Sequence, residues 1–238
     1  MTGYAPLDTL KPVAEGLWLI DGPPVIRRRL PLPSRATVVR LADGGLWVHA
    51  PTPLTEGLRV GLDAIGAVAH LVIPGADLAA QLPGWQAAWP EARVWTLETL
   101  PAPSPWVDEI DCMVLHAASG VREAVFHHRK SQSLILSDLL HNLETDKLPA
   151  WLRPVIWFSG TDHPDAAMPP ALRRGFRDRD ALADQVEQII AWRPQRIILC
   201  HGKWIACDAV AELERAFRKI LRDRMWVRAL DEIKARER

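Results

Sequence analysis

The sequence has little cysteine, no net charge and no long apolar run, and each shortage excludes a class of protein. Three cysteines among 238 residues form an odd set without a Cys-x-x-Cys pair, so we expect reduced, buried thiols rather than a disulfide framework. The 29 basic and 29 acidic residues cancel, so no overall charge attracts nucleic acid or an anionic membrane. No apolar run could span a bilayer, and the first residues lack the pattern of a signal peptide. We therefore expect a cytoplasmic protein that binds neither nucleic acid nor membranes.

Common catalytic signatures are also missing. No serine lies in a Gly-x-Ser-x-Gly elbow, no glycine-rich loop is placed to hold phosphate, and no cysteine–histidine pair has a recognisable context. Tyrosine occurs once, whereas tryptophan occurs 11 times. Because the tryptophan spacing follows the expected helices and strands, we expect most of these side chains in the core. The alternative is a ligand pocket lined by tryptophan.

Short apolar runs, interrupted by glycine and proline, predict an alternation of strands and helices. In the first half we expect strands at 16–21, 36–40, 45–49, 69–73 and 93–96, and helices at 55–65 and 82–89. In the second half we expect strands at 111–116, 123–128, 133–138 and 196–200, and helices at 139–147, 180–192, 208–222 and 225–238. Residues 148–178 read as a long irregular connection. This order predicts one α/β domain over residues 1–238, a four-layer α/β/β/α sandwich with a C-terminal tail helix at 225–238.

Two of the expected strands end on side chains that can do chemistry. One run closes on Asp138, and the sequence RIILCHG closes on His201 and Gly202. If these strands are neighbours, Asp138 and His201 lie at one rim of a sheet and form a metal-binding or an acid–base pair. The alternative role is structural, with Asp138 capping a helix and His201 hydrogen-bonded to it.

His141 is a further candidate metal ligand. Asp138, His141 and Asn142 are spaced i, i+3 and i+4, so they share one face if this segment is helical. The alternative is a solvated first turn. His163, in the long connection, could reach over the rim as a substitute ligand.

The long connection also carries four arginines, at 173, 174, 177 and 179. We expect them to be solvated. The alternative is that they bind a carboxylate or phosphate group, since the planar guanidinium group matches both in a bidentate manner.

The order of elements and the stretches LADGGLWVHAPTPLT, GAVAHLVIP, EAVFHHRKSQSLILSDLL and IILCHG resemble the metallo-β-lactamase-fold superfamily over roughly residues 10–222. Within it the sequence is most similar to a branch that consists of a domain of unknown function. The resemblance implies two metal ions at the rim of the sheets and a hydrolytic activity. It also implies that Asp138 corresponds to the aspartate that bridges the two metals, and His201 to the last histidine ligand.

The main metal motif of that superfamily, H-x-H-x-D-H, is missing. Residues 74–80 stand in its place as Pro-Gly-Ala-Asp-Leu-Ala-Ala, where Asp77 is the one possible ligand, and the next ligand position, near 118–120, also lacks histidine. A catalytic zinc ion generally needs three protein ligands. We therefore expect a degenerate site with either no cofactor or a single divalent metal ion such as zinc.

These observations leave three functional hypotheses. The first is a hydrolase-like protein with a degenerate site around Asp138 and His201, acting on an ester, lactone, thioester or phosphoester. The second is a non-catalytic protein that binds a small molecule or a partner protein and has lost metal catalysis. The third is a structural or regulatory protein that forms homo-oligomers through the tail helix. The first rests on analogy of fold, which does not fix function.

Overall fold

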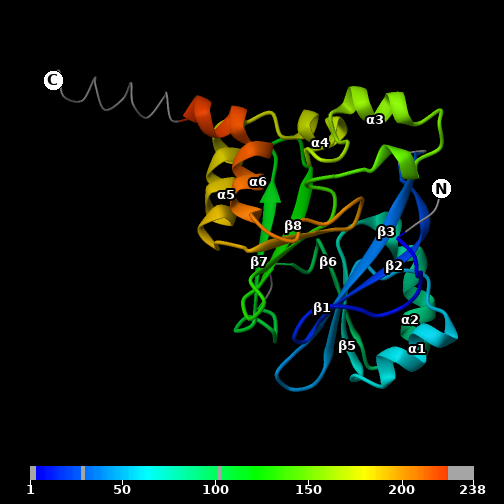
Figure 1. Cartoon of the computed structure of the whole chain (residues 1–238). Coiled ribbons are helices and arrows are strands. Elements are labelled where there is room, and N and C mark those ends of the chain that lie inside the picture. The colour runs from blue at the N-terminus through cyan, green and yellow to red at the C-terminus, as the bar shows by residue number, and fades with distance from the viewer. Residues whose placement is uncertain (1–3, 28–29, 101–102, 225–238) are drawn as a thin grey trace.

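The computed structural model describes residues 4–27, 30–100 and 103–224, in which two β-sheets pack against each other (Figure 1). The N-terminal sheet has the order β1-β2-β3-β4-β5-β6, and the C-terminal sheet has the order β10-β9-β8-β7. The first comprises β1 (Lys11–Ala14), β2 (Leu17–Arg27), β3 (Leu30–Arg40), β4 (Leu46–His49), β5 (Val68–Ile73) and β6 (Arg93–Thr96). The second comprises β7 (Ile110–His116), β8 (Arg122–His128), β9 (Ser133–Leu136) and β10 (Arg196–Leu199).

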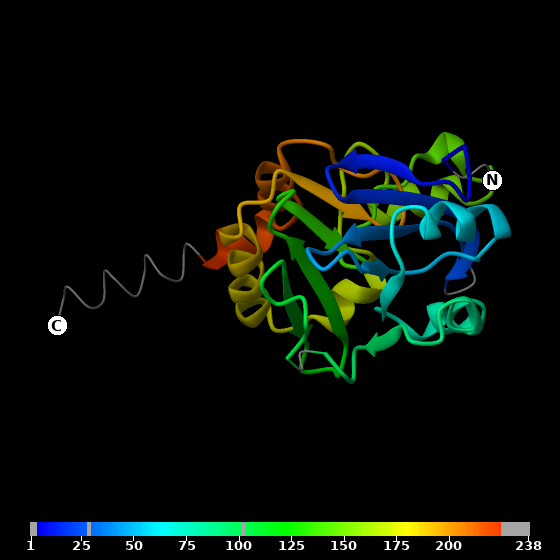
Figure 2. The ribbon, with the colours of Figure 1, turned by 90° about the horizontal axis from the view of Figure 1, so that it is seen from below.

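Helices cover the outer face of each sheet, so the described chain has four layers (Figure 2). Helices α1 (Glu56–Asp63) and α2 (Leu82–Ala88) pack their apolar faces on the N-terminal sheet, where Leu58, Leu62 and Trp85 are buried. Helices α5 (Arg179–Ala191) and α6 (Ala209–Ala216) pack on the C-terminal sheet. The α/β/β/α arrangement is the one that the sequence predicts.

The space between the sheets is filled by large aromatic side chains. Trp47, Trp95 and Trp106 are fully buried there. The Trp95 and Trp106 rings meet edge to face with centroids 4.5 Å apart, and Trp47 meets Phe126 in the same manner at 5.1 Å. The expected core role of tryptophan therefore holds for these residues.

The segment 148–178, expected to be irregular, contains two short helices. Helix α3 (Arg153–Ser159) has a proline in its first turn, where the missing N–H is harmless, and it ends at Gly160 with a φ of +71°. Helix α4 (Pro170–Gly175) also begins with proline. Both helices lie at the same end of the molecule (Figure 1).

Two other expectations differ from the structure. Strands β2 and β3 are longer than the strands expected at 16–21 and 36–40 and form a hairpin, since β2 continues through Pro23 and Pro24 with an irregularity of register between Gly22 and Val25. Residues 139–147 form no α-helix, because the backbone of 141–143 pairs with distant segments instead. The 3-10 turn η2 (Thr145–Lys147) follows.

The tail helix expected at 225–238, and with it the expected mode of self-association, lies outside the described residues. In the described part of the chain, no helix has both the length and the apolar character needed to cross a membrane.

Candidate metal centre

Strands β9 and β10 bring Asp138 and His201 to one rim of the C-terminal sheet. The two strands are parallel neighbours with Leu136 opposite Leu199, so the residues that follow them leave the sheet at the same edge. Oδ1 of Asp138 lies 3.3 Å from Nε2 of His201 and 3.3 Å from Nε2 of His141. One ligand atom from each of these three residues lies within 4.8 Å of the others. The geometry thus joins the two principal candidates from the sequence with the weaker third one.

His141 reaches the site for a different reason from the expected one. Its backbone N–H donates to the carbonyl of Ala167 at 2.9 Å, and its carbonyl accepts from the N–H of Ala167 at 3.0 Å. This pair of bonds is an isolated antiparallel bridge, so the segment is extended at this point rather than helical. The expected helix is therefore wrong, although the structure does place His141 next to Asp138.

A backbone carbonyl fixes the orientation of the His201 ring. Nδ1 of His201 lies 2.7 Å from the carbonyl oxygen of Pro33 on β3. Because a carbonyl oxygen only accepts, Nδ1 must carry a hydrogen, and a neutral ring then presents the lone pair of Nε2 to the Asp138 carboxylate. Two electron-rich atoms in contact require a proton or a cation between them. This arrangement, in which the outer ring nitrogen donates to a fixed acceptor, is typical of histidines that bind metal.

Asp138 is held as a carboxylate. Burial opposes its ionisation, but hydrogen bonds and positive charge from His141 and His201, when their facing nitrogens carry the proton, outweigh burial and keep the pKa of Asp138 well below its usual range. Its backbone N–H donates to Oε1 of buried Glu123 at 2.8 Å, which anchors the turn after β9. The side chain keeps 28% of its surface exposed, so the carboxylate is accessible to a ligand.

The N-terminal sheet supports this rim through Arg35, which is 3% exposed. Its Nη1 donates to the carbonyls of Leu199 at 2.8 Å and Gly202 at 2.7 Å, and its Nη2 forms a 2.7 Å ion pair with Asp21. The loop that carries His201 is therefore tied to β3 by side-chain and backbone bonds. Sequence reasoning missed both Arg35 and Pro33, since neither has a local pattern that indicates a role at a distant loop.

Other histidines lie outside this group of three. Nδ1 of His163 faces Oδ1 of Asn142 at 3.2 Å, so the expected substitute ligand has a structural partner instead. His49, at the end of β4, is fully buried with Nε2 3.1 Å from Oγ of Ser137. Burial lowers the pKa of His49 to about 3, which keeps this ring neutral.

At the position of the missing H-x-H-x-D-H motif, the rim of the N-terminal sheet forms a 3-10 turn, η1 (Ala76–Gln81), which is followed by α2. No histidine is present there, and the side chain of Asp77 lies outside the described ones. A described neighbour at this rim, Ile73, packs with Ala50 and Cys200 in a small apolar cluster. Apolar packing therefore lies directly beside the segment 74–80, where the resemblance implied ligands.

An apolar cavity of about 440 Å³ opens onto Asp138 and His141. Its walls come from β3, α3 and the segment 169–174, and its apolar lining includes Leu30, Leu32, Val155, Ile156, Pro169 and Leu172. Arg174 is the one basic residue among those that line it, and no tryptophan lines it, contrary to the pocket alternative considered for tryptophan. Two of the three candidate metal ligands, Asp138 and His141, thus line one side of a mainly apolar cavity of the size that holds a small molecule.

Residues 15–100 match the profile of a family described as Domain of unknown function (DUF4336). The sequence matches no curated protein. Among solved structures, the metallo-β-lactamase DIM-1 superposes with a TM-score of 0.57 at 15% identity, over 89% of this chain and 96% of that one. An NDM_FIM-1-like metallo-β-lactamase from Erythrobacter litoralis in its mono-zinc form gives 0.56 at 12% identity, over 90% and 94%.

The Flv1 flavodiiron core from Synechocystis sp. PCC6803 gives a TM-score of 0.54 at 10% identity, over 90% of this chain and 60% of that one. Similarity at this level of identity establishes the fold alone. The chain has the metallo-β-lactamase fold, as its element order predicts, and this fold is shared by proteins that differ in their chemistry.

Proposed function

We propose that the chain is a metal-dependent hydrolase that holds one divalent ion, such as zinc, between Asp138, His141 and His201. The observation that carries the proposal is the convergence of these three donors within 4.8 Å beside an apolar cavity. Two histidines and one carboxylate, with a further position left open, are a ligand set of known catalytic zinc sites. The third donor, His141, removes the main objection from the sequence, which was that two ligands hold zinc poorly.

The charge and orientation of the three donors also suit a divalent cation. Asp138 is ionised, and Nε2 of His201 is directed at it by the bond from Nδ1 to Pro33. A divalent ion at this place would polarise a substrate carbonyl or phosphoryl group and make a water molecule nucleophilic near neutral pH. The residues of the chain then position the ion and the substrate, and the apolar walls limit the access of bulk water.

The cavity favours some of the expected substrates over others. Its lining offers mainly aliphatic surface and a single cation, Arg174, so it suits esters or thioesters of apolar acids better than phosphoesters. Phosphoester hydrolysis generally relies on several cations around the transferred group. Helix α3, which forms part of the wall, also exposes Trp157 by 65% and Phe158 by 82%, so apolar surface continues next to the cavity.

Elemental analysis of protein purified without chelator or affinity metal tests the proposal. We expect about one equivalent of metal in the wild type, since the three ligands form one site, and a loss of most of it in Asp138→Ala, His141→Ala and His201→Ala. His163→Ala is the matched control, because His163 lies near this region but pairs with Asn142. Full metal content in all three ligand variants would overturn the assignment.

Hydrolysis is measured separately on p-nitrophenyl esters of increasing acyl length. We expect activity that rises with acyl length, since the walls are apolar, and that disappears in the three ligand variants. Activity that is unaffected by Asp138→Ala would place the reaction elsewhere.

A second candidate is a ligand-binding protein that keeps the ion without turnover. The absence of histidine in residues 74–80 favours it, because the fold implies two ions for ordinary hydrolysis and this rim supplies no histidine for the other one. Metal content of one equivalent, with no hydrolysis of esters, thioesters, lactones or phosphoesters, would support this candidate over the hydrolase.

A further inference from the structure

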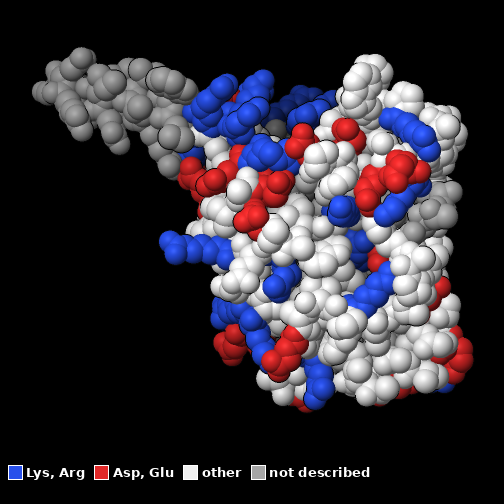
Figure 3. Space-filling view, in the orientation of Figure 1, with Lys and Arg blue, Asp and Glu red and all other residues white. Residues whose placement is uncertain are grey.

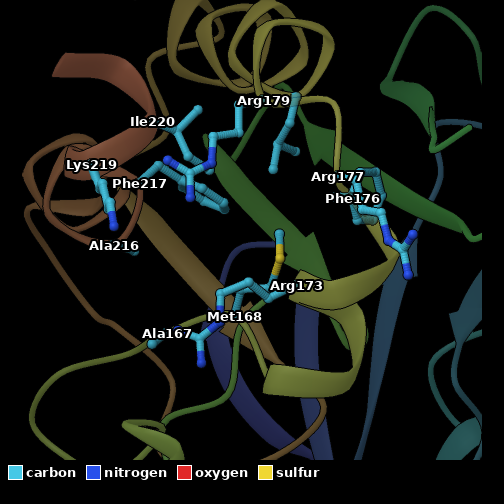
Figure 4. A pocket seen from close by; sticks show the side chains of 11 residues that line it. Ala167, Met168, Arg173, Phe176, Arg177, Arg179, Ala216, Phe217, Lys219 and Ile220 are labelled. Atoms are coloured by element: carbon cyan, nitrogen blue, oxygen red, sulfur yellow. The ribbon is translucent and has the colours of Figure 1, made fainter. Parts of the chain in front are cut away.

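A second cavity, of about 570 Å³, lies beside α4 and does not share any lining residue with the first one (Figure 4). Its lining residues come from three segments of the chain. These are 167–168, the stretch from α4 to the start of α5, and 216–220, which begins at the last residue of α6. Its floor is apolar, made by Met168, Phe176, Leu182, Phe217 and Ile220. Four of these, Met168, Phe176, Leu182 and Phe217, are almost fully buried, so the floor is part of the packed core.

Basic side chains surround this apolar floor. Arg173, Arg177, Arg179 and Lys219 line the cavity, and no acidic residue does. Figure 4 shows Arg173, Arg179 and Lys219 around the opening, with Phe217 and Met168 among them. Basic side chains also gather over this part of the molecule in the space-filling view (Figure 3). Four cations at one cavity repel each other. Because the chain as a whole carries no net charge, this cavity is a local accumulation of positive charge.

Three of the four cations have no acidic partner within the described part of the chain. Arg179 forms an ion pair with Asp223 at 3.1 Å, and Nε of Arg177 donates to the carbonyl of Arg174 at 3.4 Å. The side chains of Arg173 and Lys219 form no hydrogen bond or ion pair with any residue in 4–27, 30–100 or 103–224. Arg173 belongs to α4, whereas Lys219 follows α6 in the chain, and both side chains line the same cavity. Unpaired cations above an apolar floor are suited to a molecule with an anionic head and an apolar body.

We propose that this cavity is a binding site for a small amphiphilic anion, with a carboxylate or phosphate head between Arg173 and Lys219 and an acyl or aromatic body against Phe217 and Met168. The volume suits a small molecule. The sequence already raised the binding of a carboxylate or phosphate by the arginines at 173–179, and the structure adds Lys219 and the apolar floor. The proposal does not depend on metal binding or on hydrolysis.

The wall between the cavities belongs to both. Adjacent residues of α4 divide between them, since Arg173 lines the second cavity and Arg174 the first. Ala167, which lines the second cavity, forms the two backbone bonds that hold His141. A test must therefore separate binding at one cavity from binding at the other.

Calorimetric titration of the full chain with octyl phosphate, octanoate and inorganic phosphate tests the proposal. We expect octyl phosphate to bind at least tenfold more tightly than inorganic phosphate, because the floor contacts the alkyl chain, and to weaken as salt rises. Equal affinity for octyl phosphate and inorganic phosphate would overturn the role of the apolar floor.

Charge reversal locates the binding. Arg173→Glu and Lys219→Glu should each weaken octyl phosphate binding at least tenfold, whereas Arg218→Glu, next in sequence but outside the lining, should change it less than twofold. Arg174→Glu, and removal of metal by chelation, should also change it little, because both act on the first cavity. A larger loss in Arg174→Glu than in Lys219→Glu, or equal losses in Lys219→Glu and Arg218→Glu, would overturn the site. Thermal unfolding of each variant verifies that these exposed substitutions leave the fold intact.

Discussion

The rims of the two sheets meet at one place, yet they differ in chemistry. The rim of the C-terminal sheet presents Asp138, His141 and His201 within 4.8 Å of each other. At the rim of the N-terminal sheet, Ala50 and Ile73 pack with Cys200, and the neighbouring turn η1 contains no histidine. In the described part of the chain, the candidate ligands therefore lie on one sheet, and apolar packing lies at the facing rim of the other.

The two sheets thus contribute to the candidate site in different ways. The N-terminal sheet no longer supplies the expected histidines, but it still positions the site, through the Pro33 carbonyl and the Arg35 guanidinium. Large aromatic side chains packed between the sheets hold this support in place. The N-terminal sheet thus supports the rim on which all three candidate ligands lie.

The largest effect should come from the loop that carries His201. Gly202 has a φ of +98°, and a Cβ atom there would lie 2.1 Å from the carbonyl oxygen of Asn142. Gly202→Ala should lower the free energy of unfolding by roughly 3–5 kcal/mol, because backbone must move in addition to the strain of a left-handed conformation. Chemical denaturation measures it.

Gly44→Ala is the matched control for that change. Gly44 also has a positive φ, +87°, but an added Cβ would meet nothing within 4 Å. This variant should lose only roughly 1–2 kcal/mol, the cost of the conformation itself. Equal losses in the two variants would contradict the steric argument for Gly202.

A smaller effect concerns His49, the buried histidine at the rim of the N-terminal sheet. Its pKa of about 3 in the folded protein is below its usual 6.5. On acidification, this histidine is therefore protonated at a higher pH in the unfolded chain than in the folded protein. The stability that depends on the neutral ring is therefore complete above pH 6.5 and is lost as the pH falls from 6.5 toward 3. Between pH 8 and pH 5 this amounts to about 2 kcal/mol for one such histidine.

His49→Asn should remove that part of the pH dependence. The variant is expected to be less stable than the wild type at pH 8 but to lose less stability on acidification, as measured by urea unfolding at pH 8 and pH 5. His116→Asn, at an exposed position, serves as the control. An unchanged pH dependence in His49→Asn would mean that another group accounts for the loss in acid.

The smallest expected effect tests whether the N-terminal rim holds any metal. Asp77 is the one candidate ligand in residues 74–80. If the ion is held by the C-terminal sheet alone, Asp77→Ala keeps the wild-type metal content under conditions in which Asp138→Ala loses it. Loss of metal in Asp77→Ala would instead show that both rims contribute.

The parts of the fold that the sequence predicted are those with a local pattern. The apolar runs before Asp138 and His201 identify β9 and β10, and the rule that neighbouring parallel strands end at one edge places both side chains together. The four layers follow from the order of strands and helices. Helices α3 and α4 were missed because their prolines, which suit a helix start, also mark irregular chain.

The remaining features depend on pairings between distant segments. His141 is held by Ala167, 26 positions later, and no periodicity within 139–147 reports that bond. The acceptor for His201 is the backbone carbonyl of Pro33, which any residue could supply, so its identity carries no signal. The second cavity joins residues around α4 with residues around 216–220, which only the folded chain brings together.

Each sheet is built from one continuous half of the chain, and the chain passes between them once, from β6 to β7. The three candidate ligands all belong to the second half, whereas Pro33 and Arg35 belong to the first. Two separately produced fragments, divided between β6 and β7, would therefore have to associate before His201 is oriented. If the proposed ion binds, its affinity in such a mixture measures how well the fragments associate, and Arg35→Ala should weaken that affinity without altering any candidate ligand.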